Sequence, residues 1–582
     1  MIVLGINAYH ADSSACVLVN GKLVAAAEEE RFLRIKHWAG FPGESINFCL
    51  AEQGIVLRDV DIVAINTDPK AARFKKLKYL LRNNPSFGLV FEKIRTRKKR
   101  NNIRQTLEAR LGMEPFKGEV TYVEHHAAHL ASAFLVSPFP TAAMLSVDGF
   151  GDFCSTAWGL GEDCKMSVDG RVFFPHSLGV FYQAITQYLG FPKYGDEFKV
   201  MGLAPYGRDS YGKEISSLLS YDALTKFRLD LKYFRHHRHR IGYEWDNGIP
   251  EVSDLFSKEL ENLIGPRRRP EDSIKQKHKD LARSTQIVYE NAFFELLSDI
   301  HGDYETENLV LSGGCAMNSV ANGKVYQRTP FKHLYVQPAA GDAGGAVGAA
   351  LVAYSHRCTN VRPEQMASAF TGPRFSDKEI KNELDALPAT TGKCGCHIEY
   401  QKDFDSVLSE TAGALEKGKV VGWFQGRMEW GPRALGNRSI LCDPRRPDVK
   451  EILNTKIKRR ESFRPFAPSI LREYVSEWFE QDDDVPFMEK VFKVIREKRE
   501  LIPGVTHVDG TGRLQTVTKD SNPQFYDLIN IFGLATGVPI LLNTSFNENE
   551  PLVCRPREAL ECFMRTNMDM LVLGKYVVTR LH

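Results

Sequence analysis

The fold class is decided by the stretch MIVLGINAYHADSSACVLVNGKLVAAA, residues 1–27. Two apolar segments, 2–6 and 15–19, lie on either side of a polar loop. The dipeptide Asn20-Gly21 favours a type I′ turn, and an apolar segment over 22–27 follows it. The sequence therefore predicts a strand, a polar loop and an antiparallel hairpin.

The same pattern recurs in residues 142–159. An apolar strand over 144–147 runs into the loop DGFGD, and a second strand begins at Cys154. Asn7 and Asp148 hold equivalent positions at the two strand ends. A duplicated strand–loop–strand is typical of two-lobed actin-like and hexokinase-like ATPases, whose loops hold phosphates from the two sides of a cleft. Two unrelated hairpins are the alternative interpretation.

Further along the chain, two glycine-rich turns each follow a predicted strand. The strand at 308–311 runs into Gly313-Gly314, and a helix is expected from Met317. A second turn at 341–345 precedes a helix expected over 346–354. Glycine lets backbone N–H groups come close to an anion, so Gly313 and Gly314 are candidates for binding nucleotide phosphates. Tight packing of helix on strand is the alternative.

Composition places the chain among ordinary globular proteins. It has 582 residues, of which 43% are hydrophobic and 26% charged, and its net charge is +3. These values exclude a disordered or collagen-like chain. Near neutrality also argues against a dedicated nucleic-acid binder, although it does not exclude local patches of charge.

Positive charge is concentrated in residues 70–110, which hold fourteen Lys and Arg against two Glu. Leu77, Leu80 and Leu81 have helical spacing, so helices on the surface are predicted here. A solvated charged face is one interpretation of this segment. Binding of an anionic acceptor or partner is the other.

No targeting or membrane-spanning segment is expected. The N-terminus lacks the basic region of a secretory signal, and no stretch approaches ~18 uninterrupted apolar residues. The eleven cysteines are scattered, and Cys394 and Cys396 lack a second pair to complete a zinc site. Reduced thiols and a cytoplasmic location are therefore the expectation.

A domain boundary is expected where apolar periodicity fades, over residues 356–400. Pro363, the Gly372-Pro373 pair and Gly392 interrupt the chain there. The sequence therefore predicts two α/β domains, which span residues 1–368 and 369–582.

Three histidines lie close together on a predicted helix. His125 and His129 are four residues apart and share one face, which is how a helix presents two imidazoles to one metal. His126 and His129 form the competing pair. Asp148 at a strand end and Asp342 in a glycine turn are candidate carboxylates, and two His with two Asp suit Fe(II), Mn(II) or Zn(II). Buried structural histidines are the alternative.

The second domain contains a cluster of cations between prolines and aromatic residues. Guanidinium groups fixed beside rigid turns bind phosphates or carboxylates, and a solvated basic face is the alternative. The cluster consists of Lys456, Lys458, Arg459, Arg460 and Arg464.

Two further segments extend this candidate site. A glycine-bounded turn at 430–439 adds Arg433 and Arg438. A buried strand over 538–542 ends in NTSFN at 543–547, and the carboxyl end of a strand is the usual place for a site in an α/β domain.

Taken together, these motifs resemble the O-carbamoyltransferases of nodulation-factor and antibiotic biosynthesis, nearly from end to end. The basic segment 70–110 carries no matching motif. The matching motifs are GINAYHADSS (5–14), EEERF (28–32), HHAAH (125–129), SVDG (146–149), GDEFKVMGLAPYG (195–207), GPRALG (431–436), RESFRPFAP (460–468) and NTSFN (543–547).

The resemblance implies an α/β protein with an N-terminal two-lobed actin-like (ASKHA) domain, similar to tRNA threonylcarbamoyl transferases, and a C-terminal YrdC-like domain. It implies that carbamoyl phosphate and ATP form carbamoyl adenylate in the C-terminal domain, with release of phosphate and pyrophosphate. The carbamoyl group then passes to a substrate hydroxyl in the N-terminal domain, beside a metal. The implied ions are Fe(II) or another divalent transition metal, and Mg²⁺ with ATP.

Site residues carry over by the same resemblance. Four residues match the metal ligands, namely His125, His129, Asp148 and Asp342, and His10 matches the histidine of the transfer site. Lys458 and Arg464 are expected to act in the activation step. The residues expected to complete the anhydride-forming pocket are Arg433, Arg460, Arg513, Asn543 and Ser545.

The expected partner is a small molecule with a hydroxyl group, such as a sugar, an aminoglycoside, a polyketide, a cephem or an alkaloid alcohol. No membrane partner is expected, nucleic acid is disfavoured, and a homodimer is allowed. Two other functions are considered: a fused tRNA threonylcarbamoyladenosine synthase, whose basic segment would bind tRNA, and a non-catalytic actin-like ATP sensor. The full-length motif match disfavours the first, and His10 with the arginine cluster disfavours the second.

Overall fold

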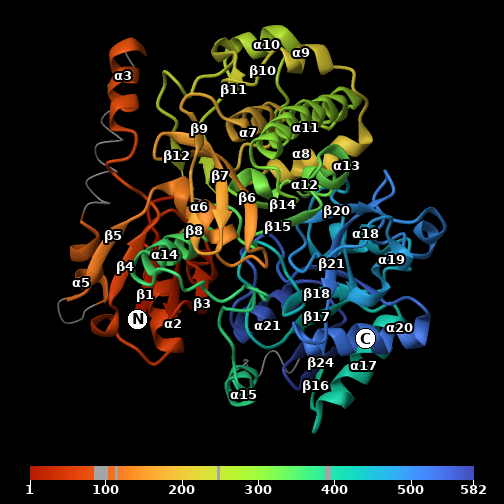
Figure 1. Cartoon of the computed structure of the whole chain (residues 1–582). Helices are drawn as coiled ribbons and strands as arrows, with labels where there is room; N and C mark the ends of the chain where they lie inside the picture. The colour runs from red at the N-terminus through yellow and green to blue at the C-terminus, as the bar shows by residue number, and fades with distance from the viewer. Residues whose placement is uncertain (84–101, 112–115, 245–249, 387–394, 582) are drawn as a thin grey trace. The chain divides into compact units, whose positions relative to one another are not determined.

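The computed structural model describes residues 1–83, 102–111, 116–244, 250–386 and 395–581. The chain divides into two compact units, Met1–Met366 and Ala367–His582. Figure 1 follows the chain from its red N-terminus to its blue C-terminus. Helices and strands alternate in both units, so the predicted α/β class is confirmed.

The first unit opens with a five-stranded sheet of order β3-β2-β1-β4-β5. Asn20 and Gly21 join β2 to β3 with φ angles of 50° and 83°, as the predicted type I′ turn requires. β1 pairs antiparallel with β2 and parallel with β4, and β5 is parallel to β4. The strands are β1 (Ile2–Asn7), β2 (Ser14–Val19), β3 (Lys22–Glu28), β4 (Ile62–Ile65) and β5 (Glu119–Tyr122).

A second sheet repeats this arrangement. β6 pairs antiparallel with β7 and parallel with β14, β7 pairs antiparallel with β9, and β15 is parallel to β14. The predicted duplication is confirmed, because each sheet is built on a strand–loop–strand with two parallel strands added beside the first. The strands are β6 (Thr141–Gly151), β7 (Cys154–Glu162), β8 (Lys165–Met166), β9 (Gly170–Phe173), β14 (Asn308–Ser312) and β15 (His333–Val336).

Helices α6 (His125–Phe134) and α14 (Gly344–Arg357) form a layer between the two sheets. α14 packs on β1, β2 and β4, α6 packs on β6 and β14, and the two helices pack on each other. A Cβ atom on Gly348 would lie 1.7 Å from the Ala128 carbonyl oxygen. Only glycine therefore allows α14 to approach α6 this closely.

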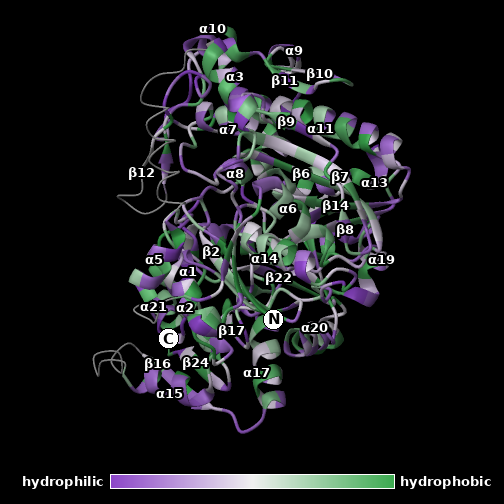
Figure 2. Cartoon of the chain, turned by 60° about the vertical axis from the view of Figure 1, so that its left-hand side comes forward, coloured by the Kyte–Doolittle hydropathy of each residue, from purple (hydrophilic) through white to green (hydrophobic). Residues whose placement is uncertain are grey.

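The outer faces of the two sheets are covered by other helices. Ile46 and Leu50 of α2 and Leu107 of α5 join the core of the first sheet. Hydrophobic and hydrophilic residues both occur along α11 (Figure 2). Its buried residues contribute to the second lobe, which is the part of the first unit built on the sheet of β6, β7, β14 and β15. The helices named here and the remaining long ones are α2 (Gly43–Glu52), α3 (Arg73–Asn83), α5 (Ile103–Leu111), α7 (Leu178–Tyr188), α8 (Glu197–Leu203), α10 (Lys258–Ile264) and α11 (Gln276–Tyr304).

The helix expected from Met317 begins two residues later and is divided in two. After a 3-10 turn, η4 (Gly314–Met317), come the short helices α12 (Ser319–Asn322) and α13 (Val325–Arg328). Asn318 starts α12, because its side chain accepts the N–H of Ala321 as an N-cap.

The second unit is built on a nine-stranded mixed sheet of order β16-β24-β23-β17-β18-β22-β19-β21-β20. Trp423, Phe525 and Phe532 form the centre of a core in which α17 (Phe404–Glu416) and α20 (Pro523–Thr536) pack on the sheet. The strands are β16 (Cys396–Tyr400), β17 (Val421–Phe424), β18 (Arg438–Cys442), β19 (Ala467–Leu471), β20 (Lys490–Lys493), β21 (Thr511–Val517), β22 (Ile540–Ser545), β23 (Met570–Leu573) and β24 (Tyr576–Arg580).

None of the helices in the described part of the chain combines the length and the apolar composition needed to cross a membrane.

Candidate functional site

Helix α6 presents two imidazoles at one point. Nε2 of His125 lies 3.0 Å from Nε2 of His129, one turn further along the helix. Two carboxylates fix the start of this helix: the Glu124 side chain accepts the N–H groups of His126 and Ala127, and Asp152 Oδ2 accepts that of His125 at 3.0 Å. The predicted helix is confirmed, and its N-terminus is held rigidly.

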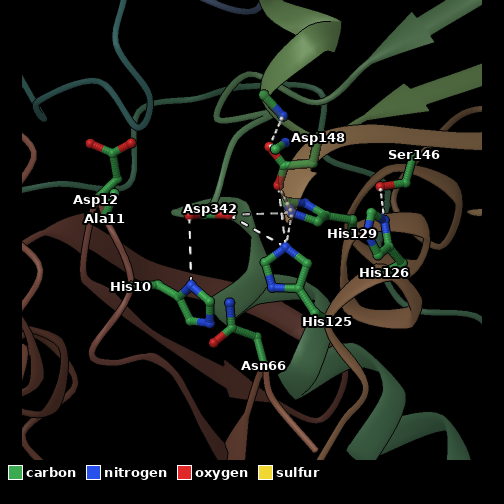
Figure 3. Close-up of polar contacts among 12 residues, drawn as sticks. His10, Ala11, Asp12, Asn66, His125, His126, His129, Ser146, Asp148 and Asp342 are labelled. Carbon is green, nitrogen blue, oxygen red and sulfur yellow. Dashed lines mark hydrogen bonds and ion pairs between the residues drawn. The ribbon is translucent and has the colours of Figure 1, made fainter. Parts of the chain in front are cut away.

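Asp148 faces the two imidazoles from the second sheet (Figure 3). It follows Val147, the last residue before the pairing of β6 and β7 becomes irregular. Its Oδ1 accepts the backbone N–H groups of Gly149 at 2.7 Å and Gly314 at 3.2 Å. Its Oδ2 lies 3.2 Å from Nε2 of both His125 and His129. One oxygen is thus used for orientation while the other faces the imidazoles.

Asp342 completes the group from the turn before α14. Its Oδ1 is buried without a hydrogen-bond partner among the described residues. This atom lies 3.5 Å from His125 Nε2 and 3.6 Å from His129 Nε2. One ligand atom from each of the four side chains lies within 4.8 Å of the other three. Two imidazole nitrogens and two carboxylate oxygens converging in this way fit a divalent transition metal.

The charges of this cluster are strongly coupled. Burial and the charge of Asp148 raise the pKa of Asp342. Burial would raise the pKa of Asp148 too, but hydrogen bonds from His125 and His129 hold it well below its usual value. Burial lowers the pKa of His129, but the hydrogen bond to Asp148 and the charges of both carboxylates raise it to about 9. A cation between the two carboxylates would relieve their repulsion.

His126 does not belong to this cluster. Its Nδ1 lies 2.9 Å from Ser146 Oγ, and burial together with the charge of His125 lowers its pKa to about 4. Of the two histidine pairs left open by the sequence, the structure therefore brings His125 and His129 to the carboxylates.

His10 lies beside the same cluster, in the loop between β1 and β2. Its Nδ1 is 4.0 Å from Asp342 Oδ2, and its ring centroid is 5.1 Å from that of His125. The loop is fixed by Asn7, whose Nδ2 donates to the carbonyl oxygens of Ala11 and Asp12 at 3.0 and 2.9 Å. The first lobe thus adds a third imidazole to the cluster (Figure 3).

In the second unit, four arginines lie close enough to affect one another. Burial and the charges of Arg433, Arg460 and Arg464 hold the pKa of Arg513 well below its usual value. Arg513 Nε is buried and has no hydrogen-bond partner in the described part of the chain. Burial also lowers the pKa of Arg433 to about 10. Glu461 pairs with Arg464 at 3.4 Å, but one carboxylate does not balance four guanidinium groups, and this excess of positive charge favours the binding of an anion.

Comparison with known proteins settles the family. The family model described as carbamoyltransferase N-terminus matches residues 2–351, and that of the carbamoyltransferase C-terminus matches residues 412–580.

The chain belongs to the carbamoyltransferase family.

Named relatives agree with this assignment. The nodulation protein NolNO of Sinorhizobium fredii is 38% identical, over 99% of this chain and 80% of its own. A protein of Synechocystis is 40% identical over 99% of this chain and 96% of its own. The 3'-hydroxymethylcephem-O-carbamoyltransferase of Amycolatopsis lactamdurans is 36% identical over 46% of this chain and 48% of its own. The resemblance predicted from the motifs is confirmed.

Two glycines of the carbamoyltransferase support the metal-ligand cluster, the name used here for the candidate ligands His125, His129, Asp148 and Asp342. Gly313 has a φ of +84°, and a Cβ there would lie 2.3 Å from the Val147 carbonyl oxygen. Its neighbour Gly314 donates its N–H to Asp148. Both therefore have roles in packing and in orienting Asp148, and their contact with nucleotide stays a prediction.

The predicted residues of the second unit occupy two kinds of environment. Lys458 is buried, and its Nζ makes three hydrogen bonds. It donates to the side-chain Oδ1 and to the backbone carbonyl oxygen of Asn547, both at 2.8 Å, and to the backbone carbonyl oxygen of Ser545. Asn543 Nδ2 donates to Ser469 Oγ at 3.1 Å and to Gln515 Oε1 at 3.0 Å. These contacts tie the end of β22 to its surroundings. Among the four arginines, Arg460 Nε donates to Asn454 Oδ1 at 2.8 Å and Arg464 pairs with Glu461 at 3.4 Å.

Arg438 differs from the other arginines of the candidate site. It is fully buried, stacks 3.7 Å above the Phe424 ring and donates to the carbonyl oxygens of Gln425 and Pro373. Of the two arginines in the turn at 430–439, only Arg433 therefore stays a candidate for binding an anion.

Two supporting carboxylates of the carbamoyltransferase were missed by sequence reasoning. Asp152 holds the N–H of His125, and Glu429 Oε1 accepts the N–H groups of Leu435, Asn437 and Arg438 in the turn that carries Arg433. The spacing of Asp148 and Asp152 in one loop was the available signal for the first. For Glu429, the sequence held no signal that predicted its role.

Proposed function

We propose that this carbamoyltransferase is an ATP-dependent O-carbamoyltransferase with a small-molecule alcohol as its acceptor. Carbamoyl phosphate loses its phosphate, with consumption of one water, and the resulting carbamate oxygen attacks the α-phosphorus of ATP. Pyrophosphate leaves, and carbamoyl adenylate forms. The acceptor hydroxyl then attacks the carbamoyl carbon, AMP leaves, and the hydroxyl proton passes to a base.

The arginine cluster supports the first step. Carbamoyl phosphate and the triphosphate of ATP are both polyanions, and Arg433, Arg460, Arg464 and Arg513 offer guanidinium groups whose mutual repulsion such ligands would relieve. Cations already in place when charge develops on phosphorus stabilise the transition state more than the ground state. We assign Arg464 to catalysis here, and Lys458, whose ammonium donates to Ser545 and Asn547, positions the end of β22 beside the arginines.

The observation that carries the proposal is His10 beside the metal-ligand cluster. Its Nδ1 lies 4.0 Å from Asp342 Oδ2, so a carboxylate is placed to orient the ring and to stabilise its protonated form. A histidine titrates near neutral pH and can therefore accept the proton of an attacking hydroxyl.

The residues that would hold the metal are His125, His129, Asp148 and Asp342. When bound, a divalent ion supplies a Lewis acid that polarises a carbonyl group. Asp148 is kept in its orientation by the N–H groups of Gly149 and Gly314, and α6 is kept in place by Glu124 and Asp152. Iron is our choice of metal through the resemblance to the family.

The relatives support a hydroxyl acceptor, because one of them is named for O-carbamoylation of a hydroxymethylcephem. The test is incubation of the purified chain with carbamoyl phosphate, ATP and a panel of alcohols. Mass spectrometry should detect a product that has gained one carbamoyl group, together with AMP in equal amount. AMP formation without any carbamoylated alcohol across sugars, aminoglycosides and cephems would contradict the assigned acceptor class. Absence of AMP would contradict the first step.

A further inference from the structure

Helix α3 (Arg73–Asn83) exposes large apolar side chains to solvent. Phe74 is 89% exposed, Leu81 77% and Leu77 56%. Leu77 and Leu81 lie three and seven residues after Phe74, so at 3.6 residues per turn the three side chains share one face of the helix. A continuous exposed apolar face on a helix is costly in water, and it marks an interaction surface.

Cations border this apolar face. Next to each apolar residue along this face lies a cation, so the cations form a second stripe parallel to the apolar one. They are Lys75, Lys78 and Arg82, which have the same spacing as Phe74, Leu77 and Leu81. The helix contains five Lys and Arg and no acidic residue. Arg73, Lys78 and Arg82 form no ion pair within the part of the chain that the structure describes. Green and purple residues are both seen on α3 in Figure 2.

One side chain on the opposite face attaches the helix to the first unit. Tyr79 donates its hydroxyl to the His237 carbonyl oxygen at 2.6 Å, and its ring lies 5.0 Å from Phe174 and 5.8 Å from Phe153. Lys75 Nζ also lies 4.9 Å above the Phe173 ring. These contacts leave the face of Phe74, Leu77 and Leu81 directed away from the unit.

Charge is distributed unevenly along the chain. The segment 70–110 has fourteen Lys and Arg against two Glu, a charge of +12. The rest of the chain has 62 Lys and Arg against 71 Asp and Glu, a charge of −9. An anionic surface would therefore attract this segment and repel the remainder, which sets an orientation.

We propose that α3 docks the protein on the surface of an anionic lipid bilayer. Lys and Arg on one face with Phe and Leu beside them are the features of helices that lie in the membrane interface. Eleven residues span about 16 Å, too short to cross a bilayer, so the helix lies parallel to the surface. This proposal departs from the sequence-based expectation of no membrane partner, and it rests on the exposure of these side chains in the structure.

The apolar face favours lipid over the other anionic partners. RNA would contact the cations and leave Leu77 and Leu81 in water, since RNA recognition relies on phosphate contacts and on stacking with aromatic or arginine side chains. A bilayer buries the leucines and neutralises the cations at once.

The experiment is flotation of the full-length protein with vesicles of phosphatidylcholine alone and with vesicles in which a third of the lipid is phosphatidylglycerol. Two variants test the two stripes, Leu77→Glu with Leu81→Glu and Lys78→Gln with Arg82→Gln. Matched controls are Leu224→Glu, which alters a leucine that is 95% exposed elsewhere in the same unit, and Lys213→Gln with Lys417→Gln. Far-ultraviolet circular dichroism confirms that each variant is folded.

We expect binding to the anionic vesicles alone, weakened by salt. Each double variant should bind about tenfold or more weakly, and the controls should bind as the wild type does. Equal binding to both kinds of vesicle, or no binding, would overturn the proposal. Two other results would also overturn the proposal. In one, vesicles are not bound and tRNA is bound even by the Leu77→Glu, Leu81→Glu variant. In the other, the protein is a dimer without lipid, and this double variant is a monomer.

Discussion

Asp152 accepts a hydrogen bond from the backbone N–H of His125 at 3.0 Å. The same oxygen accepts the N–H of Asp68 at 2.7 Å, and the other carboxylate oxygen accepts the Thr67 hydroxyl at 2.8 Å. One buried carboxylate therefore joins the chain after β4 to the first turn of α6. The position of the metal-ligand cluster depends on a side chain that does not itself belong to it.

Replacing Asp152 by Asn should weaken metal binding without preventing folding. Asp152 has a φ of 48°, which Asn tolerates, but an amide has one acceptor oxygen and cannot satisfy all three donors. Loss of such a supporting contact typically costs 10- to 100-fold in metal affinity. Competition with a coloured chelator measures this. Asp163→Asn, at an exposed residue with a φ of 51°, is the matched control, and equal affinity in the two variants would refute the role of Asp152.

Substitutions of His126 and His129, two histidines of α6, should have opposite effects on the metal content of the protein. His129→Ala removes one of four converging ligands, so metal content should fall from about one ion per chain to almost none. His126→Asn keeps a hydrogen-bonding group near Ser146 and should retain the metal. Elemental analysis of both variants, purified in parallel, decides the matter. A metal-free wild type that still transfers the carbamoyl group would contradict the assignment.

Local patterns were predicted well, and contacts between distant segments were not. The helix at 125–134 was placed correctly because its alanine and leucine residues favour a helix locally. Choosing between His125 and His126 required knowing which face of α6 meets Asp148 and Asp342, both far away in the sequence. The helix expected from Met317 starts only at Ser319, because the side chain of Asn318 acts as its N-cap. Lys458 was selected for its charge, and the structure adds its contacts with Ser545 and Asn547.

Arg513→Gln should abolish AMP formation while leaving the chain stable. Its guanidinium is disfavoured by burial and by three neighbouring arginines, so its removal should not lower the melting temperature. Pyrophosphate should stabilise the wild type, by about 2.7 kcal/mol at a hundred times its Kd, and should not stabilise the variant. Differential scanning fluorimetry with and without pyrophosphate measures this. The control is Arg496→Gln, at an exposed residue, and equal stabilisation of all three proteins would be inconsistent with an anion site here.

The pH dependence of stability should reflect His236. Burial lowers its pKa to about 4, and its Nε2 lies 2.8 Å from the Pro175 carbonyl oxygen. Between about pH 4 and 6.5 the unfolded chain therefore binds a proton that the folded chain does not, so stability falls as the pH falls through this range. His236→Gln should show a shallower loss, by up to about 1.4 kcal/mol per pH unit. Urea unfolding at several pH values, with the exposed His333→Gln as the control, measures the slopes. Identical slopes for all three proteins would show that His236 does not titrate in this way.

The role of His10 as the base for the acceptor hydroxyl is tested most directly by measuring the two half-reactions separately in the wild type and in His10→Asn. AMP release from ATP and carbamoyl phosphate should be retained in the variant, because the arginine cluster of the second unit is unchanged. Formation of carbamoylated alcohol, followed by mass spectrometry, should fall by about 10²- to 10⁴-fold, the usual contribution of a general base. Loss of AMP release with normal transfer from preformed carbamoyl adenylate would place His10 in the first step and contradict the account.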